Sequence, residues 1–182
     1  MTAVVRPCLA AETEARLPEL GALLADAVAR GASVNFMAGF TAAEGEAFWR
    51  GQLSGLQVGE RRLLVAEAAG HLVGTVVLSF APQPNGPHRA EIGKMLVHSA
   101  HRRQGLGRRL LEAAEGAAWD AGRTLLLLDT EAGSAGASLY EACGWTAYGL
   151  MPDHSYTPDG RLAAAAYFFK VLGPHRRPGD AA

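Results

Sequence analysis

The chain has 182 residues, of which 49% are hydrophobic and 19% are charged, and its formal net charge is −1. This length and apolar content predict a folded domain that needs neither disulfides nor a metal ion for stability. The near-neutral charge argues against nucleic-acid binding through a basic surface. No apolar run approaches the roughly 18–20 residues that span a bilayer. Cys8 and Cys143 show neither disulfide-framework nor zinc-site spacing, and Met1 to Ala11 lacks the apolar stretch of a signal peptide. We therefore expect a cytoplasmic protein that binds no metal, membrane or nucleic acid.

The expected elements of the first half are a strand, two helices and three strands. The run Ala3-Val4-Val5 predicts a short strand, which Pro7 places at a sheet edge. Pro18 and leucines at helical spacing predict a helix over Pro18–Arg30 that Gly31 ends. Thr41 and Glu44 have the spacing of a capping box, which predicts a second helix through about Leu56. Strands are then expected over Arg62–Ala68, Leu72–Phe80 and Arg89–His98.

The second half predicts a helix, a strand, a short helix and a closing pair of strands. Their expected bounds are Leu106–Ala121, Thr124–Leu128, Ala135–Ala142, Trp145–Leu150 and Leu162–Leu172. The continuous apolar run at Thr124–Leu128 is typical of a strand covered on both faces. This order predicts an α/β (α+β) fold: a mixed sheet with an embedded β-α-β unit. We expect a single domain over residues 1–172 and a frayed tail over residues 173–182.

A basic, glycine-rich turn joins the strand that holds Glu91 to the helix that begins near Leu106. Residues 102–107 are Arg-Arg-Gln-Gly-Leu-Gly. The N–H groups of a first helical turn have no partners within the helix, and the helix dipole adds partial positive charge there. Glycines let a phosphate approach the backbone, so the turn predicts a diphosphate site. The alternative is a plain turn with solvated arginines. Neither a Walker A loop nor a GxGxxG fingerprint is present.

The turn resembles the Arg/Gln-x-x-Gly-x-Gly/Ala coenzyme A loop of the GNAT family of N-acetyltransferases. The segment Leu139-Tyr140-Glu141-Ala142-Cys143-Gly144-Trp145 is similar to that family's Leu-Tyr-x-x-x-Gly-Phe segment. The chain looks closest to the tabtoxin-resistance type, through stretches such as Lys94-Met95-Leu96-Val97-His98. The resemblance implies the GNAT acyl-CoA N-acyltransferase fold, with a mixed, mostly antiparallel sheet, a central parallel β-α-β unit and helices on both faces. It also implies acetyl-CoA as co-substrate. The implied acceptor is a primary amine of a small molecule, of the toxin or antibiotic kind such as a β-lactam amino acid. Dimers are common in the family, but no residue here demonstrates a homodimer.

The cofactor-binding residues follow from the turn and the resemblance together. A backbone N–H of Met95, Leu96 or Val97 is expected to hold the thioester carbonyl, provided that the strand splays or bulges there. The other expected cofactor-binding residues are Arg102, Arg103, Gln104, Gly105, Leu106, Gly107, Arg108 and Ser138.

Acetyl transfer to an amine needs a base, charge stabilisation and an acid for the leaving thiolate. Glu91 is the candidate base, with Asp129 as a second carboxylate implied by the resemblance. If their strands are parallel neighbours, both carboxylates are expected to face the crevice at the strand ends. Tyr140 is the candidate acid. The plainer interpretations are a solvated strand-edge charge for Glu91, a helix N-cap for Asp129 and a packing role for Tyr140. Two other functions stay open: a coenzyme A binding or sensing module without turnover, and a protein or peptide N-acetyltransferase.

Overall fold

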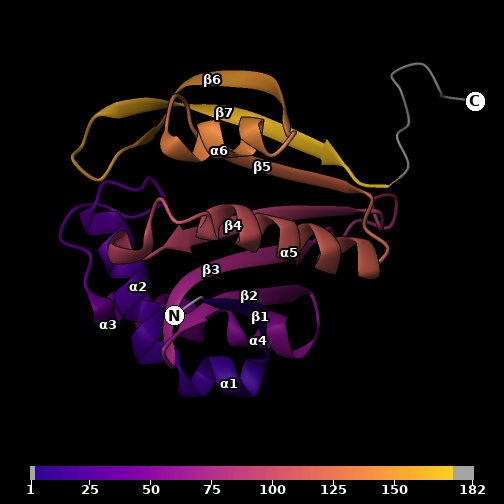
Figure 1. Ribbon diagram of the computed structural model, residues 1–182. Helices are drawn as coiled ribbons and strands as arrows, with labels where there is room; N and C mark the ends of the chain where they lie inside the picture. The colour runs from indigo at the N-terminus through magenta and orange to yellow at the C-terminus, as the bar shows by residue number, and fades with distance from the viewer. Residues whose placement is uncertain (1–2, 174–182) are drawn as a thin grey trace, which may run out of the picture.

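A seven-stranded sheet forms the centre of the protein in the computed structural model, which describes residues 3–173 (Figure 1). Its strand order is β1-β2-β3-β4-β5-β7-β6. Neighbouring strands are antiparallel except β4 and β5, which are parallel. The mixed, mostly antiparallel sheet with a central parallel unit is therefore confirmed, as is the edge position of the strand with Pro7. The strands are β1 (Val4–Cys8), β2 (Arg61–Ala68), β3 (His71–Phe80), β4 (Arg89–Val97), β5 (Leu125–Glu131), β6 (Thr146–Tyr156) and β7 (Leu162–Val171).

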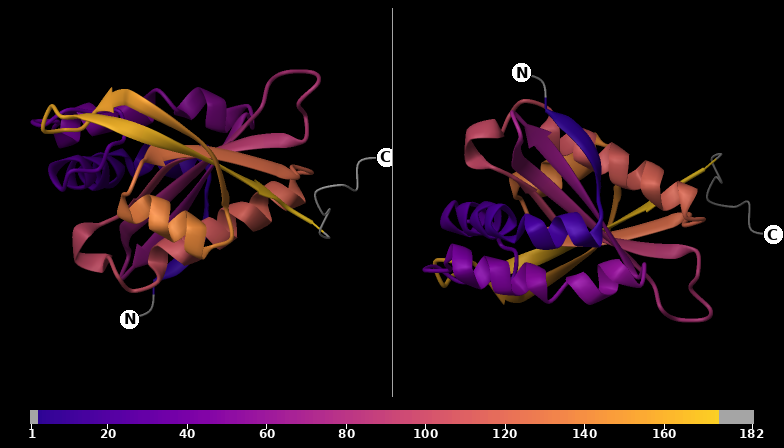
Figure 2. Two further views of the ribbon diagram at one scale, coloured as in Figure 1. Left: turned by 90° about the horizontal axis from the view of Figure 1, so that it is seen from above. Right: turned by 90° about the horizontal axis from the view of Figure 1, so that it is seen from below.

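Helices cover both faces of this sheet, as expected from the sequence. The helices α1, α2, α3 and α4 lie on one face, while α5 and α6 lie on the other (Figure 2). A single 3₁₀ turn, η1, precedes α5. None of the helices in the described residues is long and apolar enough to cross a membrane. The bounds are α1 (Ala10–Ala15), α2 (Leu17–Ala29), α3 (Ala42–Arg50), α4 (Leu53–Gln57), η1 (Ser99–His101), α5 (Leu106–Asp120) and α6 (Ala135–Ala142).

Each sheet face has its own apolar core. The stripe of α5, including Leu110, Leu111 and Ala114, is fully buried against β3, β4 and β5. On the other face, leucines of α2 pack with Trp49 of α3 against β2 and β3. Trp49 is fully buried, and its Nε1–H donates to the Leu20 carbonyl oxygen at 3.1 Å. The helices are thus fixed by burial of one apolar face each.

Two glycines allow α2 and α3 to cross in close contact. A Cβ atom built on Gly21 would lie 2.5 Å from the carbonyl oxygen of Ala42, and one on Gly45 would lie 2.6 Å from the carbonyl oxygen of Gly21. Any side chain at either position would therefore push the helices apart. The Thr41 capping box at the start of α3 is confirmed, because Glu44 N–H donates to Thr41 Oγ1 at 3.3 Å and Thr41 N–H donates to a Glu44 carboxylate oxygen at 2.8 Å.

Three local expectations were wrong, and one helix was missed. The helix expected from Thr41 to about Leu56 is broken at Gly51, where low helix propensity lets the chain turn between α3 and α4. The expected strand Thr124–Leu128 continues to Glu131, and only Leu126 and Leu128 are fully buried, so its second face is partly open. The strand expected over Trp145–Leu150 runs on to Tyr156. The short helix α1 was not predicted.

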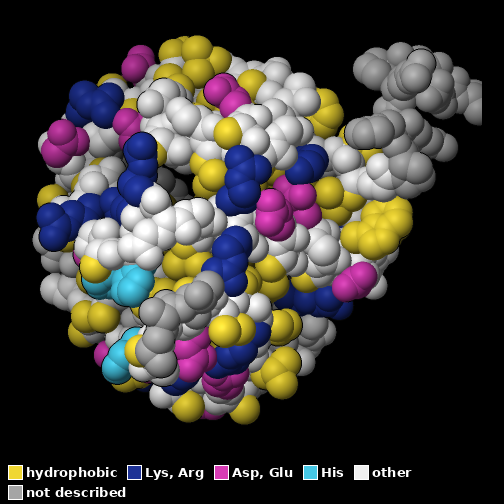
Figure 3. Space-filling model, viewed as in Figure 1, with side chains coloured by type: hydrophobic (Ala, Val, Ile, Leu, Met, Phe, Trp, Pro, Cys, Tyr) yellow, Lys and Arg dark blue, Asp and Glu magenta, His cyan; other side chains and the backbone are white. Residues whose placement is uncertain are grey.

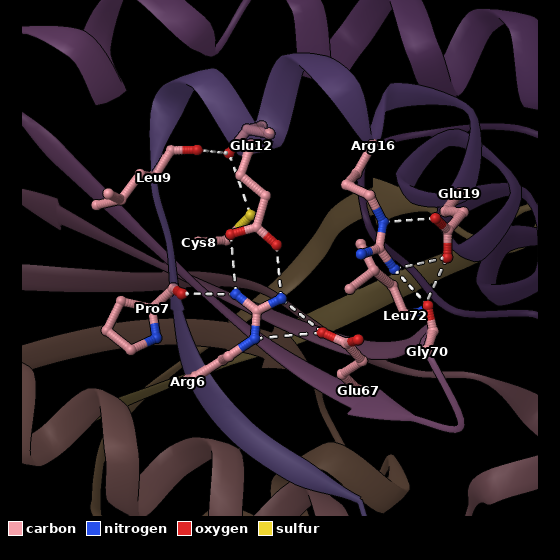
Figure 4. A network of polar contacts seen from close by, with 11 residues as sticks. Arg6, Pro7, Cys8, Leu9, Glu12, Arg16, Glu19, Glu67, Gly70 and Leu72 are labelled. Carbon is pink, nitrogen blue, oxygen red and sulfur yellow. Dashed lines mark hydrogen bonds and ion pairs between the residues drawn. The ribbon is translucent and has the colours of Figure 1, made fainter.

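Ion pairs hold α1 in place (Figure 4). The guanidinium of Arg6 on β1 donates to the Glu12 carboxylate of α1 at 2.8 Å and to the Glu67 carboxylate of β2 at 3.2 Å. Arg16 pairs with Glu19, whose carboxylate accepts a hydrogen bond from Leu72 N–H at 3.0 Å. Six residues with little apolar surface thus form a helix through tertiary contacts. The periodicity of the sequence carried no signal of it.

Candidate active site

The two parallel strands of the sheet separate half-way along their length. β4 pairs with β5 only from Arg89–Leu125 to Glu91–Leu127. On its other side, β4 stays paired with β3 as far as Val97. The second half of β4 therefore has an open edge facing β5, and a cavity of about 370 Å³ opens there. Its walls come from the end of α2, β4, β5 and α6, and include Ser33, Val97, Arg102, Asp129 and Tyr140. We call this cavity the cleft.

A β-bulge in β4 adds to the separation of β4 from β5. Thr75 pairs with Leu96 and Val77 pairs with Gly93, so β4 has one residue too many, and Lys94 takes φ 46°. Beyond the bulge, His98 N–H donates to the Val73 carbonyl of β3 at 2.9 Å. Because N–H directions alternate along a strand, the N–H of Val97 points toward the cleft. The condition for a free N–H near Met95–Val97, a splay or a bulge of the strand, is thus met by both.

These three residues contribute to the cleft in different ways. Met95, Leu96 and Val97 all line it. The Leu96 side chain is 3% exposed and packs in the core beneath α2, so only its backbone is available to a ligand. Met95 and Val97 pack from the other side of β4, toward α5.

The basic turn presents a row of backbone donors at one end of the cleft. From Arg103 to Arg108, no backbone N–H donates a hydrogen bond to any acceptor within residues 3–173. Gly105 takes φ 75°, a left-handed conformation that turns the chain into α5. Six N–H groups without partners at the positive end of the 15-residue α5 have the geometry that suits an anion. A Cβ atom on Gly105 would meet nothing within 4 Å, so this side of the turn is open to a ligand.

Contacts beneath the turn hold it in shape. Ser99 N–H and Oγ–H donate to the Asp26 carboxylate of α2 at 2.8 and 2.7 Å. Arg102 donates through Nε to the Val97 carbonyl at 3.0 Å. The Arg108 guanidinium donates to the Ala142 carbonyl of α6 at 3.2 Å. Lys and Arg side chains gather around a hollow on this face, with histidines nearby (Figure 3).

The other predicted residues of the turn differ in what they expose. The side chains of Arg103, Gln104 and Arg108 are exposed, whereas the Leu106 side chain is 5% exposed and belongs to the core. A Cβ atom on Gly107 would lie 3.0 Å from a Leu139 methyl, so this glycine lets α5 approach α6. Leu106 and Gly107 can therefore serve a ligand only through their backbone.

The two candidate carboxylates lie on one sheet face but line different hollows. Leu126 and Leu128 are buried under α5, as are Ala90 and Ile92, so alternation turns Asp129 and Glu91 to the opposite face. Asp129 lines the cleft. Glu91 instead lines a neighbouring groove of about 730 Å³, which corrects the expectation that both carboxylates face one crevice.

The electrostatics of the pair suit a base more than a structural charge. Although the Glu91 side chain is exposed, partial desolvation raises the pKa of its carboxyl, the negative charge of Asp129 raises it further, and the Lys94 ammonium lowers it. Within the described residues, neither carboxylate has a cation within 4 Å. Glu91 is solvated, but it lies on the fourth of seven strands and so is not at a sheet edge. Asp129 is no helix cap, because Ser134 caps α6.

Tyr140 combines a packed ring with a hydroxyl group at the cleft. Its side chain is 7% exposed and its ring lies 5.9 Å from the centroids of both Trp145 and Phe168. The hydroxyl points to Met95 Sδ at 3.9 Å, a weak contact that leaves it available to a better acceptor. Burial raises the pKa of this phenol to about 12, so it stays protonated at neutral pH. The packing role is therefore real and does not compete with a proton-donating role.

Besides Glu91, a second candidate residue lies away from the cleft, and one residue that lines the cleft was missed. Ser138 is exposed on α6 and does not line the cleft; its hydroxyl donates to the Ser134 carbonyl at 3.4 Å. Lys94 does line the cleft. Its ammonium lies 5.3 Å from the ring centroid of Phe48. Burial lowers the pKa of Lys94, while Asp129 and Glu91 raise it. Its only sequence signal was that lysine is rare in a chain rich in arginine.

Comparison with known proteins decides the family. A family model described as the acetyltransferase (GNAT) family matches residues 27–145, which hold the end of α2, the splayed strands, the basic turn and Tyr140. The chain belongs to the GNAT family. This acetyltransferase is similar over 93% of its length to a ribosomal-protein-alanine N-acetyltransferase from Brucella melitensis, with 26% identity and a TM-score of 0.75.

Two further structures share the GNAT fold. A putative acetyltransferase from Salmonella typhimurium, solved with acetyl-CoA, is 21% identical, with both chains covered over 100% and a TM-score of 0.76. A phosphinothricin acetyltransferase from Sinorhizobium meliloti, in complex with acetyl-CoA, is 21% identical, with 98% and 95% covered and a TM-score of 0.77. The protein is thus a GNAT N-acetyltransferase, and acetyl-CoA fits as its co-substrate: the unpaired N–H row suits a diphosphate, and the cleft beside it holds Asp129 and Tyr140.

Proposed function

We propose that this acetyltransferase transfers the acetyl group of acetyl-CoA to a primary amine of a small molecule. The observation that supports it best is the arrangement of the cleft: six unpaired N–H groups at one end, and the Asp129 carboxylate with the Tyr140 phenol in its wall. A toxin or antibiotic of the amino-acid kind is the proposed acceptor, as for the tabtoxin-resistance type. The phosphinothricin acetyltransferase with the same fold supports this acceptor class.

The donor is proposed to lie along the open edge of β4. The N–H groups of Arg103, Gln104, Gly105, Leu106, Gly107 and Arg108 bind its diphosphate, with the Arg102 side chain close by. The backbone of Met95, Leu96 and Val97 continues the β4 edge toward the thioester. Ser138, on the exposed face of α6, is proposed to touch the donor only at its outer end.

The chemistry then falls to four groups: Glu91 in the neighbouring groove, and the Val97 N–H, Asp129 and Tyr140 in the cleft. Acetyl-CoA supplies a thioester that an amine can attack directly, so no residue of the chain needs to form a covalent bond. Glu91 takes a proton from the amine, directly or through a water, and its raised pKa suits that task near neutral pH. The N–H of Val97 donates to the carbonyl oxygen as negative charge grows on it. Tyr140 gives its phenolic proton to the departing sulfur. Asp129 helps to hold the amine as a cation before it loses its proton.

A protein N-acetyltransferase is the second candidate, because the 26% identical structure is a ribosomal-protein-alanine N-acetyltransferase. A coenzyme A sensing module is the third. A binding module needs the basic turn alone, whereas this chain also carries Asp129 and Tyr140 in the cleft and Glu91 in the neighbouring groove.

A panel of acceptors separates these functions. Purified protein is incubated with acetyl-CoA and small amines, amino acids including β-lactam amino acids, or peptides with N-terminal alanine, and thiol release is followed with a mass measurement of product. We expect a small amine to be acetylated with the highest kcat/KM. Preference for the peptides would favour the second candidate. Tight coenzyme A binding without thiol release would favour the sensing module.

A further inference from the structure

A second hollow on the sheet carries three arginines and ends at the candidate base. It has a volume of about 730 Å³ and lies between the end of α4, the loop after β3 and the first residues of β4 and β5. Arg61, Arg89 and Arg123 line it together with Glu91, Ser79 and Leu127. Its floor is one row across four strands, because Arg61 pairs with Ser79, Ser79 with Glu91 and Glu91 with Leu127. We call this hollow the arginine groove.

The arginines of the groove lack anionic partners. The Nε atoms of Arg89 and Arg123 are buried, and neither has a hydrogen-bond partner within residues 3–173. In the same part of the chain, no carboxylate lies within 4 Å of Arg61, Arg89 or Arg123. A buried Nε–H group without a hydrogen-bond partner is costly, so two of them beside one hollow point to a bound ligand, and the positive charge of the guanidinium groups favours an anion.

Packing, instead of ion pairing, holds the two guanidinium groups in position. Arg89 lies against the backbone of the preceding loop, where a Cβ atom on Gly86 would be 2.4 Å from its Nη2. The Arg123 guanidinium lies 4.6 Å from the ring centroid of Phe80. Contacts of this kind orient the planar group and leave its N–H donors available. Planar donors suit a carboxylate, a phosphinate or a sulfonate.

The groove also sets a distance between that anion and the reacting amine. Arg89 and Glu91 are two residues apart on β4 and face the same side, which puts their backbones about 7 Å apart along the strand. An amine at the Glu91 carboxylate and an anion at the Arg89 guanidinium would be separated by a similar length. An α-amino carboxylate is too short to reach both groups, whereas a chain of four or five carbons between amine and anion spans them.

We propose that the arginine groove binds the anionic group of the acceptor, and that the preferred acceptor is a zwitterion whose amine and anion are about 7 Å apart. This inference rests on the proposed acetyl transfer and specifies its acceptor. The nitrogen then lies at the junction of groove and cleft, beside Glu91, while Arg89 and Arg123 hold the far end of the molecule. The groove acts in binding, so its loss should raise KM more than it lowers kcat.

Matched acceptors test the proposal without any substitution in the protein. The probes are 5-aminopentanoate, pentylamine, 1,5-diaminopentane and norvaline, each assayed with acetyl-CoA for thiol release. Charge-assisted hydrogen bonds predict a kcat/KM about 10- to 100-fold higher for 5-aminopentanoate than for pentylamine or the diamine. Norvaline, whose amine and carboxylate are adjacent, should fall below 5-aminopentanoate as well. Equal kcat/KM for the charged and uncharged amines would overturn the proposal.

Variants locate the anion site. Arg89→Met and Arg123→Met should each raise KM for 5-aminopentanoate about tenfold and leave KM for pentylamine unchanged. Arg89→Lys should restore part of the affinity. Arg50→Met, an exposed arginine on α3, is the matched control and should change neither value. If either groove variant loses its native circular dichroism spectrum, the comparison of matched acceptors on the unchanged protein still tests the anion site, because it needs no variant.

A binding measurement separates this inference from the proposed function. Pentanoate has the anion and the length but no amine, so it cannot be acetylated. Calorimetry should show that pentanoate binds the unchanged protein and binds Arg89→Met at least tenfold more weakly. Such binding with no acetylation of any amine would refute the acetyl-transfer proposal and keep the anion site. Acetylation of amines regardless of charge, with no pentanoate binding, would refute the anion site and keep the acetyl transfer.

Discussion

Replacing Tyr140 by Phe removes one hydroxyl group and leaves the packing of the ring almost unchanged. The ring keeps its contacts with Trp145 and Phe168. The hydroxyl's hydrogen-bond contact within the described residues is the weak one to Met95 Sδ at 3.9 Å. Loss of such a contact should change the free energy of unfolding by less than about 1 kcal/mol. The variant therefore isolates the chemistry of the phenol from its structural role.

The expected loss of rate follows from the proton that Tyr140 donates. General acid catalysis contributes roughly 10²- to 10⁴-fold in enzymes. We expect the lower end here, because a thiolate leaves readily and because burial raises the phenol's pKa to about 12, which makes it a weaker acid. The predicted fall in kcat is about 100-fold, equivalent to about 2.7 kcal/mol of transition-state free energy.

Thiol release under saturating acetyl-CoA measures kcat, and calorimetry with coenzyme A measures donor affinity. Tyr167→Phe is the matched control, because the Tyr167 hydroxyl also contacts a methionine sulfur, that of Met151 at 3.8 Å, and Tyr167 does not line the cleft. Tyr140→Phe should lose kcat with unchanged coenzyme A affinity, and Tyr167→Phe should lose neither. An equal loss of kcat and affinity in Tyr140→Phe, or an unchanged kcat, would refute the role of the phenol as acid.

Three further predictions follow from the same geometry. Because the pKa of Glu91 is raised, its carboxyl group stays protonated to a higher pH than usual, so kcat/KM should rise with pH through that raised pKa. Glu91→Gln should remove this rise, with a reaction that is slowed most at neutral pH and recovers in part at high pH. An identical pH profile in the variant would place the base elsewhere. Gly105→Ala and the control Gly70→Ala, a glycine at φ 81° in the turn between β2 and β3, should each lower the free energy of unfolding by about 1–2 kcal/mol through backbone strain. Only Gly105→Ala should also weaken coenzyme A binding. Equal effects of the two on coenzyme A affinity would contradict the diphosphate site. Gly45→Ala should lower the free energy of unfolding by about 1–3 kcal/mol, measured by urea denaturation, because its Cβ atom would lie 2.6 Å from the Gly21 carbonyl oxygen, and an unchanged midpoint would show that α2 and α3 can separate freely.

The elements with strong apolar periodicity were predictable from the sequence, and the others were not. The stripe of α5 was found because burial on one face leaves a regular pattern, and β2 and β3 were found because burial on both faces leaves continuous apolar runs. Helix α1 was missed because the ion pair of its Glu12 with Arg6 of β1, which Glu67 of β2 also holds, stabilises it instead of an apolar face. β6 has ten exposed residues out of eleven, so its length beyond Leu150 left no hydrophobic pattern to read.

The candidate site also has a part that the sequence could predict and a part that it could not. The basic turn was predictable, because the residue types at the start of α5 specify an anion site by themselves. The place of Lys94 in the cleft depends on the bulge in β4, and a bulge of this kind has no clear sequence signature when a lysine takes the positive φ. The separation of Glu91 from Asp129 into different hollows depends on where β4 and β5 stop pairing. Register of this kind is a property of the assembled sheet.

A nuclear magnetic resonance titration of the ¹⁵N-labelled protein with coenzyme A tests the row of N–H donors most directly. Binding of a diphosphate at the start of α5 predicts that the amide signals from Arg103 to Arg108 shift and saturate together, while the amide of Gly70, on the turn between β2 and β3, stays in place. Amide signals of Arg103 to Arg108 that do not move, with saturable shifts elsewhere or none at all, would contradict the account of the donor site.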